Sequence, residues 1–356
     1  MNDDVTRPYQ APGNTPPERA GSGSGNALPA GTRLGEFELL SVAGEGGFSI
    51  VYRAWDHSLQ RPVALKEYLP HGIAGRADGL QVRVKSIRNQ ETFEAGLQSF
   101  VKEAQMLARF DHPSLVKVFR FWEANGAAYM VMPFYEGRTL RDELRQRGGA
   151  PLDEATLLGW LGPVADALAV IHHAHWYHRD VAPDNVMLLA GSGQPLLLDF
   201  GAARQVIGDR TQALTVILKP GFAPLEQYGD IPGMRQGPWT DVYQLAAVGY
   251  YALTGRIPPA AVGRMLNDSF VPLTQLADGL MSRHVLEALD HALAVRPEAR
   301  SQDIAQFKDE LGLPPPPPPP AGSFTAHMPP PSAAAATARP PAGSGALPPT
   351  ALDLGA

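Results

Sequence analysis

The 356-residue chain contains no cysteine. This absence excludes a disulfide framework, a thiolate zinc site and a cysteine nucleophile, and it is compatible with the reducing cytoplasm, where we expect the protein to act. Charge of one sign is also lacking, because the formal net charge is only −6. Domains that bind nucleic acid are usually strongly basic, so the sequence predicts no nucleic-acid partner.

Long hydrophobic runs are a further feature that we find missing. No apolar run approaches the ~18 residues that a membrane-spanning helix needs. Residues 1–25 show no basic-then-apolar pattern of the kind that signal peptides carry. We therefore expect no membrane span.

Glycine (36 residues) and proline (35 residues) are abundant and concentrate at the two ends. Residues 1–34 have few apolar side chains and cannot offset the entropy lost on ordering, so we expect this segment to be disordered. Residues 314–356 begin with an unbroken proline run, which favours polyproline II, and continue in alanine, proline and glycine. This Pro/Ala-rich tail is also expected to be disordered, as a spacer or as the ligand of a partner with an aromatic groove.

The sequence between these ends, residues 35–313, is predicted to fold as one domain with two lobes. Short apolar runs in its first third predict strands at residues 37–43, 50–55, 62–67 and 127–134. Helical spacing of apolar residues predicts helices at residues 100–108, 157–173 and 241–253. The expected fold class is therefore α+β: a β-rich N-terminal lobe (N-lobe, about 35–134) with one main helix, and a mostly helical C-terminal lobe (C-lobe, about 135–313).

A glycine-rich hairpin is expected between the first two strands. Glycine there lets backbone N–H groups approach phosphate oxygens closely, although a glycine turn alone indicates no more than a hairpin. The segment consists of Gly44, Glu45, Gly46, Gly47, Phe48, Ser49, Ile50 and Val51.

A lysine follows on the next strand, in the run Val63-Ala64-Leu65-Lys66. Strand alternation places Ala64 and Lys66 on one face. A lysine on an apolar strand needs a partner or a ligand, unless it reaches solvent at an edge. Glu103, in the following helix, is the predicted partner, with Glu91 and Glu94 as alternatives.

Two later motifs carry oxygen ligands and a candidate base. The run from His178 to Asn185 contains Asp180, which can accept a proton from a hydroxyl, and Asn185 offers a neutral oxygen to Mg²⁺. Asp199 follows an apolar strand directly, before Phe200 and a glycine, and is a second candidate ligand. Each motif alone could be a turn or a cap, but their order behind the hairpin and the lysine makes chance a poor explanation.

In this order the motifs resemble the signature set of eukaryotic-type protein kinases, over nearly all of residues 36–312. Their style resembles the bacterial serine/threonine protein kinases. The resemblance implies a two-lobed protein kinase fold and transfer of the γ-phosphoryl group of ATP, with Mg²⁺ or Mn²⁺, to hydroxyl groups of protein substrates.

The resemblance also implies a role for each motif residue. Lys66 would hold the α- and β-phosphates and pair with Glu103, Asp180 would be the catalytic carboxylate, and Asn185 and Asp199 would hold the metal. The implied ATP-binding residues are Gly44, Glu45, Gly46, Gly47, Phe48, Ser49, Val51, Ala64, Lys66, Met132, Pro133 and Tyr135. Met132 would lie behind the adenine, and Pro133 and Tyr135 would form the hinge, where proline still offers its carbonyl. In the C-lobe, Glu226 would pair with Arg300, and Asp241 would anchor the catalytic loop.

The sequence departs from the family at Ser49, in a long link at residues 67–99 that we expect to be a solvated loop, and at Ala182. Serine/threonine kinases carry a lysine at the position of Ala182, so a pseudokinase that binds nucleotide or acts as a scaffold is the alternative function. A small-molecule kinase is more remote, because residues 201–226 form a long activation segment. Lys219 aligns without a gap to a threonine that faces the missing lysine, and we predict that it supplies the lost charge.

The same segment contains the candidate phosphorylation sites. Thr215, with Thr211 as second choice, is predicted to be autophosphorylated. Its phosphate would pair with the guanidinium of Arg179, next to Asp180.

Overall fold

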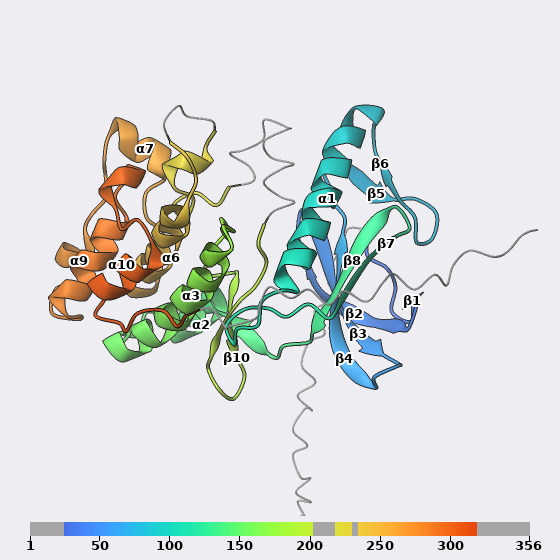
Figure 1. Cartoon of the computed structure of the whole chain (residues 1–356), viewed down its shortest axis with the longest axis horizontal. Coiled ribbons are helices and arrows are strands. Elements are labelled where there is room, and N and C mark those ends of the chain that lie inside the picture. Colours follow the sequence, from blue (N-terminus) through green and yellow to red (C-terminus); the bar gives the residue numbers. More distant parts are fainter. Residues whose placement is uncertain (1–24, 202–217, 230–233, 319–356) are drawn as a thin grey trace, which may run out of the picture.

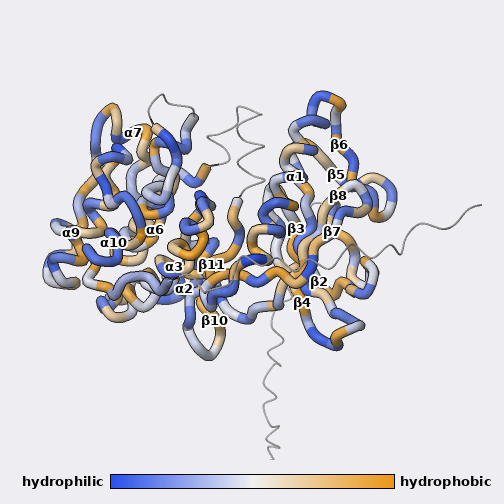
Figure 2. The backbone as a smooth tube through the Cα atoms, viewed as in Figure 1, coloured by the Kyte–Doolittle hydropathy of each residue, from blue (hydrophilic) through white to orange (hydrophobic). Residues whose placement is uncertain are grey.

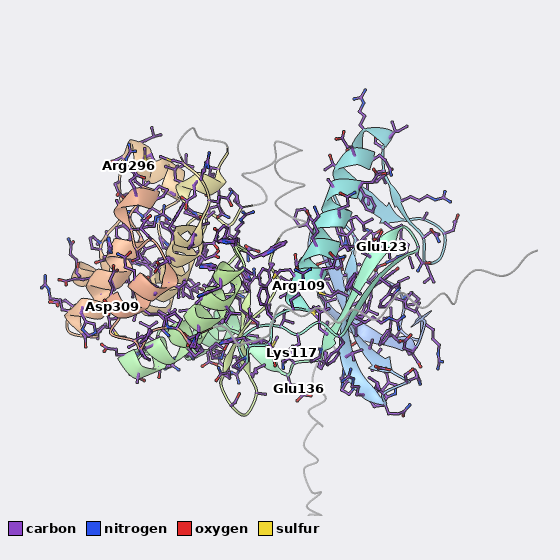
Figure 3. All side chains as sticks on the ribbon, in the orientation of Figure 1. Arg109, Lys117, Glu123, Glu136, Arg296 and Asp309 are labelled. Carbon is purple, nitrogen blue, oxygen red and sulfur yellow. The ribbon has the colours of Figure 1, made fainter. Side chains whose placement is uncertain are left out.

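The computed structural model describes residues 25–201, 218–229 and 234–318. These residues form two lobes that lie side by side, the β-rich N-lobe on the right of Figure 1 and the helical C-lobe on the left. The predicted α+β two-lobed architecture is confirmed. Charged side chains cover both lobes, and the six labelled in Figure 3 are all exposed, with Lys117 and Glu136 at the junction between the lobes.

A six-stranded antiparallel sheet forms the N-lobe, in the order β1-β2-β3-β4-β8-β7. Its strands are β1 (Arg33–Leu34), β2 (Phe37–Glu45), β3 (Ser49–Asp56), β4 (Arg61–Tyr68), β7 (Arg120–Ala124) and β8 (Ala127–Pro133). Helix α1 (Gln90–Leu107) packs on β7 and β8 and buries Phe93 and Phe100. The predicted strands and helix are confirmed, but α1 begins ten residues before the expected start.

The link at residues 67–99 is an ordered element, so our expectation of a solvated loop is wrong. It contains β5 (Ala74–Arg76), β6 (Val82–Val84), the 3₁₀ turn η1 (Ile87–Asn89) and the first turns of α1. Glu67 is fully buried and accepts hydrogen bonds from the Tyr52 hydroxyl at 2.9 Å and from Arg76 at 2.5 Å. A buried carboxylate needs such donors, and here they hold the β5–β6 hairpin on the sheet.

Residues 25–34, which we expected to be disordered, pack on the same network. Leu28 is buried, and its N–H donates to the Tyr52 hydroxyl at 3.0 Å. The side-chain oxygen of Asn26 accepts from the Arg76 N–H at 2.9 Å. The ordered domain therefore starts earlier than residue 35, because one leucine and one asparagine find specific partners. Residues 1–24 and 319–356 lie outside the described residues, so disorder there stays a prediction.

The C-lobe is built around helices α3 (Glu154–His173) and α6 (Pro238–Thr254), which pack on each other. Asp153 caps α3 by accepting a hydrogen bond from the Thr156 N–H at 2.7 Å. The remaining elements are β9 (Gly137–Thr139), α2 (Leu140–Arg147), β10 (Val186–Leu189), β11 (Pro195–Leu197), η2 (Leu225–Gln227), α7 (Ala261–Leu266), α8 (Leu273–Leu276), α9 (Arg283–Ala292), η3 (Pro297–Ala299) and α10 (Ile304–Glu310). Strands β9, β10 and β11 form a small antiparallel sheet in the order β11-β10-β9.

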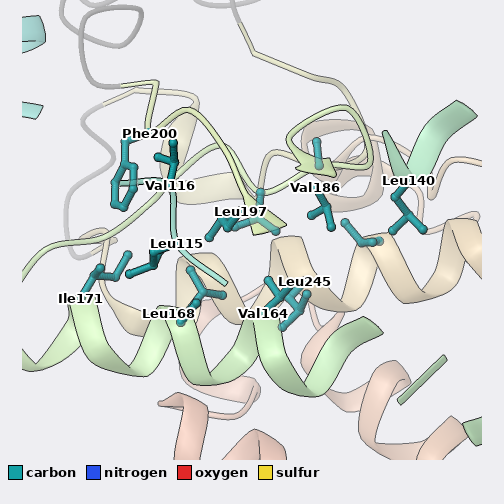
Figure 4. Packing of buried hydrophobic residues seen from close by; sticks show 14 of the residues in the cluster. Leu115, Val116, Leu140, Val164, Leu168, Ile171, Val186, Leu197, Phe200 and Leu245 are labelled. Atoms are coloured by element: carbon teal, nitrogen blue, oxygen red, sulfur yellow. The ribbon is translucent and has the colours of Figure 1, made fainter. Parts of the chain in front are cut away.

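An apolar layer lies between these helices and the loops that face the N-lobe. In Figure 4 Leu168 and Ile171 project from α3 toward Leu115 and Leu197, and all four are fully or nearly fully buried. In Figure 2 hydrophobic segments run along α3 and α6, inside the C-lobe. This close-packed support fixes the backbone from which the side chains of the candidate site project.

Helix α3 also corrects our estimate of apolar runs. Within the described ranges it is the one helix long and apolar enough to cross a bilayer, with a mean hydropathy of 1.4 over 18 residues. However, 61% of that stretch is buried inside the protein, which is typical of a core helix.

Candidate active site

The lysine on β4 lies between two carboxylates. The Lys66 ammonium is 2.8 Å from Asp199 Oδ1 and 3.5 Å from Glu103 Oε1, and only 7% of its side chain is exposed. Of the three candidate glutamates, Glu103 is therefore the one beside Lys66. Burial alone would lower the pKa of Lys66, but the two carboxylates outweigh it and raise the pKa above its usual value.

The loop that contains His178 and Asp180 is anchored by one buried carboxylate on α6. Asp241 accepts the backbone N–H of His178 at 2.8 Å, the N–H of Arg179 at 2.6 Å and the ring N–H of His172 at 2.7 Å. Burial alone would raise the pKa of Asp241, but these donors lower it below its usual value. Arg179 has φ = +63°, a backbone conformation that such anchoring can hold.

His178 links this loop to the strand before Asp199. Its Nε2–H donates to the Leu198 carbonyl at 2.9 Å, and its Nδ1 accepts the Asp180 N–H at 3.3 Å. The two bonds require the same neutral tautomer, with the proton on Nε2. Its ring packs on Phe200, with the centroids 4.6 Å apart. The two motifs are thus held together by one imidazole.

Asp180 is oriented by the asparagine five residues later. Asn185 Nδ2 donates to Asp180 Oδ2 at 2.8 Å and to the Asp180 carbonyl at 2.7 Å. The amide nitrogen is thereby used, and the amide oxygen is the group that Asn185 can offer to a cation. Gly201 passes close by with φ = +57°, and a Cβ there would lie 3.1 Å from Asp180 Cβ. The backbone conformation therefore favours glycine after Phe200, and any side chain there would be tight against Asp180.

The donors near Asp199 suit a hard cation. A carboxylate and an amide oxygen, from Asp199 and Asn185, are the ligand types that Mg²⁺ takes in sites completed by phosphate and water. The Asp199 side chain is 45% exposed, so it can reach a ligand. The surrounding protein still removes part of its hydration, which alone would raise the pKa of Asp199, but the Lys66 ammonium outweighs this and lowers the pKa.

Lys219 faces Asp180, the predicted catalytic carboxylate. Its Nζ lies 3.3 Å from Asp180 Oδ1, whereas Ala182, where the family carries a lysine, is fully buried. The Lys219 carbonyl accepts the N–H groups of Phe222 and Ala223, each at 3.0 Å, which closes a tight turn. Within this turn Gly221 has φ = +85°.

Any side chain at Gly221 would meet two neighbouring residues. A Cβ there would lie 2.3 Å from Ile257 and 2.4 Å from the Pro258 carbonyl oxygen. The turn that delivers Lys219 therefore requires glycine.

The expected hinge lies at the end of β8. Met132 is buried and pairs with Ala64 across the β4–β8 ladder, and Pro133 lies opposite Val63. The Tyr135 hydroxyl accepts the Lys117 N–H at 3.3 Å. The strands therefore bring Ala64, Met132 and Pro133 together, next to the glycine-rich hairpin formed by β2 and β3.

Comparison with known proteins agrees with this geometry. The protein kinase domain family matches residues 37–270. The chain belongs to the protein kinase family. Its curated relatives include the serine/threonine-protein kinase PknK of Mycobacterium tuberculosis, 29% identical over 292 residues, which are 80% of this chain and 24% of PknK. PknB of Mycobacterium leprae is 32% identical over 291 residues, 77% of this chain and 42% of PknB.

Solved structures show the same likeness. The apo form of PpkA-294 is 45% identical, with a TM-score of 0.74, over 80% of this chain and 99% of that one. The kinase domain of Mycobacterium tuberculosis PknI shares the fold, at 23% identity and a TM-score of 0.58. The predicted resemblance to bacterial serine/threonine kinases is confirmed. The chain spans about a quarter of PknK and less than half of PknB.

Several supporting residues of this kinase were not found from the sequence. Gln244 accepts the Val181 N–H at 2.9 Å and donates to the Arg179 carbonyl, which also receives Gln227. Gln244 lies three residues after Asp241, so it is on the same face of α6, and this spacing was the available signal. Arg141 forms an ion pair with Asp184, which is 43 positions later in the sequence, and no local pattern predicts this pair.

The later landmarks of the kinase fold have mixed outcomes. Glu226 and Arg300 are 3.0 Å apart and fully buried, as expected. Thr211 and Thr215 lie outside the described residues.

Proposed function

We propose that this kinase transfers the γ-phosphoryl group of Mg·ATP to serine or threonine hydroxyls of proteins. The observation that carries the proposal is the assembly of four separate motifs at one place. Lys66 lies within 3.5 Å of both Glu103 and Asp199, and Asn185 orients Asp180 at 2.8 Å. Residues from β4, α1, the catalytic loop and the segment after β11 meet there, as phosphoryl transfer requires.

The chemical step follows from the positions of these groups. The hydroxyl oxygen of the acceptor forms a bond to the γ-phosphorus while the bond to the β–γ bridging oxygen breaks, and ADP leaves with that electron pair. Asp180 accepts the hydroxyl proton. Lys66 positions the α- and β-phosphates, and Lys219 offsets charge on the transferred group.

Asn185 and Asp199 would hold Mg²⁺, and Mn²⁺ would fit the same oxygen ligands. The bound ion would neutralise phosphate charge. The adenine would lie against Ala64 and Met132, beside the hinge of Pro133 and Tyr135. The phosphates would lie under the glycine-rich hairpin, residues 44–51.

Autophosphorylation of the activation segment belongs to the proposal, with Thr215 as first site and Thr211 as second. Arg179, anchored through its backbone to Asp241, would receive the phosphate. Protein substrates, a partner for the Pro/Ala-rich tail and a cytoplasmic location stay predictions.

A pseudokinase is the second candidate, and Ala182 is the residue that favours it. Lys219 argues against a pseudokinase, because an ammonium 3.3 Å from Asp180 can supply the charge that Ala182 does not. The two functions differ in one property: a pseudokinase can bind nucleotide but releases no ADP.

Incubation with labelled ATP and Mg²⁺, followed by mass spectrometry of phosphorylated sites, tests the proposal. Asp180→Asn should abolish transfer and retain nucleotide binding, because Asp180 acts on the hydroxyl. Lys66→Met should lose both phosphate positioning and most of the rate. Transfer by Asp180→Asn at a rate comparable with wild type would refute the catalytic assignment, and nucleotide binding without any transfer by the wild type would favour the pseudokinase.

A further inference from the structure

The chain that follows β4 runs beside the tip of the glycine-rich hairpin. The β3–β4 ladder has its last pair at Ser49 and Tyr68. Beyond it, the Leu69 N–H donates to the Phe48 carbonyl at 3.0 Å and the His71 N–H donates to the Gly47 carbonyl at 2.9 Å. Strand-like pairing therefore continues past the regular strands and into the hairpin that is expected to cover the phosphates.

A side-chain contact reinforces this pairing. His71 Nδ1 lies 3.4 Å from Glu45 Oε1, on the opposite limb of the hairpin, and both side chains are about four-fifths buried. On its other side, the His71 carbonyl accepts the Lys85 ammonium at 2.6 Å. Residues 69–71, which we call the hairpin anchor, thus bind both limbs of the hairpin.

The hairpin anchor is itself fixed to the sheet. Arg76 holds the next segment to buried Glu67, the neighbour of Lys66. The Val82 N–H donates to the Asn125 carbonyl at 2.9 Å, which ties the β5–β6 hairpin to the turn between β7 and β8. The glycine-rich hairpin is therefore attached to the same rigid body that carries the phosphate-binding lysine.

We propose that the hairpin anchor, with His71 as a positioning residue, holds the glycine-rich hairpin in place for nucleotide phosphates before ATP arrives. The inference rests on the proposed nucleotide binding. A glycine-rich loop is costly to order, because glycine loses more backbone freedom than any other residue. If the hairpin is already ordered in the folded protein, this loss of entropy no longer opposes nucleotide binding. The anchor therefore strengthens nucleotide affinity.

Three single variants and one double variant remove the anchor in steps. His71→Ala deletes the contact with Glu45 and keeps the backbone bond, so the KM for ATP and the Kd for Mg·ADP should rise about threefold. Glu45→Gln should have a similar effect, and the double variant should be little worse than either single one. His71→Pro also deletes the N–H donor and should raise both constants about tenfold. In His71→Ala and His71→Pro, kcat should stay within about twofold of wild type, because an anchor acts on binding and not on the transition state.

A matched control is present on the same strands. His57 Nε2 lies 2.6 Å from Glu38. This pair is at the ends of β2 and β3 that lie away from the hairpin tip. His57→Ala and Glu38→Gln remove a comparable histidine–glutamate contact and should leave the KM for ATP unchanged. His71→Lys, which places an N–H donor near Glu45 again, should recover part of the affinity lost in His71→Ala.

Amide exchange separates the anchor from nucleotide binding. In the nucleotide-free protein, exchange over residues 45–50 should accelerate in His71→Ala and His71→Pro, and not in His57→Ala. His71→Ala serves as the test variant if His71→Pro does not fold. If His71→Ala binds nucleotide and exchanges its amides as the wild type does, the inference is overturned. A wild-type protein that binds no nucleotide would overturn the proposed function, and faster exchange in the variants would then still support a held hairpin.

Discussion

Replacement of Lys219 by alanine tests whether this kinase has moved its phosphate-facing lysine from the catalytic loop to the activation segment. The Lys219 ammonium lies 3.3 Å from Asp180, where the acceptor hydroxyl and the γ-phosphoryl group would meet in the proposed function. Ala182 is fully buried and cannot contribute charge. We expect Lys219→Ala to lower kcat/KM for the protein substrate while nucleotide binding changes little.

The size of the effect follows from distance and exposure. Two unit charges 4 Å apart interact by about 4 kcal/mol at an effective dielectric constant of 20. The side chains of Lys219 and Asp180 are 23% and 17% exposed, so water and salt weaken the interaction but do not abolish it. We therefore expect a loss of about 2 kcal/mol in transition-state stabilisation, which is roughly a 30-fold fall in kcat/KM.

Steady-state transfer to a protein substrate, with wild type and variants at equal concentration, measures this loss. Lys117→Ala is the matched control, because that lysine also pairs with an aspartate, Asp111, at 2.6 Å but is 50% exposed. Lys219→Arg keeps the charge and should retain most activity. A lysine placed at buried Ala182 in the Lys219→Ala background should restore only part, since its stem must displace packed neighbours. Equal kcat/KM for wild type and Lys219→Ala would refute the charge replacement.

The remaining predictions concern stability and regulation. Asp241→Asn should lower the free energy of unfolding by about 3 kcal/mol at pH 7. The folded-state pKa of Asp241 lies below its usual value, so this stabilisation is present above about pH 4 and is lost as the pH falls through the folded pKa. In urea unfolding, the difference in stability between wild type and Asp241→Asn should therefore be smaller at pH 3 than at pH 7. Glu67→Gln leaves the Arg76 guanidinium without its carboxylate and should cost about 2–3 kcal/mol, against less than about 0.5 kcal/mol for exposed Glu123→Gln, in the same assay. Thr215→Ala should remove the main autophosphorylation site; an unchanged phosphopeptide map would count against it.

Local patterns predicted most of the fold and the principal site residues. The strands β2, β3, β4 and β8 alternate or concentrate apolar residues over short runs, and α3 and α6 repeat them at helical spacing, so their type follows from periodicity. Lys66, Asp180, Asn185 and Asp199 were predicted as site residues because their motifs are short and their order is specific, and the structure pairs Lys66 with Asp199 and Asn185 with Asp180. The choice of Glu103 over Glu91 and Glu94 also agreed with the geometry, since Glu103 is the one beside Lys66.

Elements with weak local patterns were misjudged. Residues 67–99 and 25–34 contain few periodic apolar runs, yet they are ordered, because one buried carboxylate, Glu67, collects donors from Tyr52, Tyr129 and Arg76. None of these partners is near the others in sequence. A composition rule therefore favours a loop, although a specific network stabilises the segment.

The sequence alone determined the family of this protein and the chemical groups of its candidate site, because glycine, lysine, aspartate and asparagine in a fixed order leave few other chemistries. Tertiary structure decided which groups touch. It brings Lys219 to Asp180, sets Gln244 under the catalytic loop and attaches His71 to the glycine-rich hairpin. Contacts of this kind join residues as far as 133 positions apart, as Lys66 and Asp199 are, and their energy depends on distance and burial, which no local sequence pattern encodes.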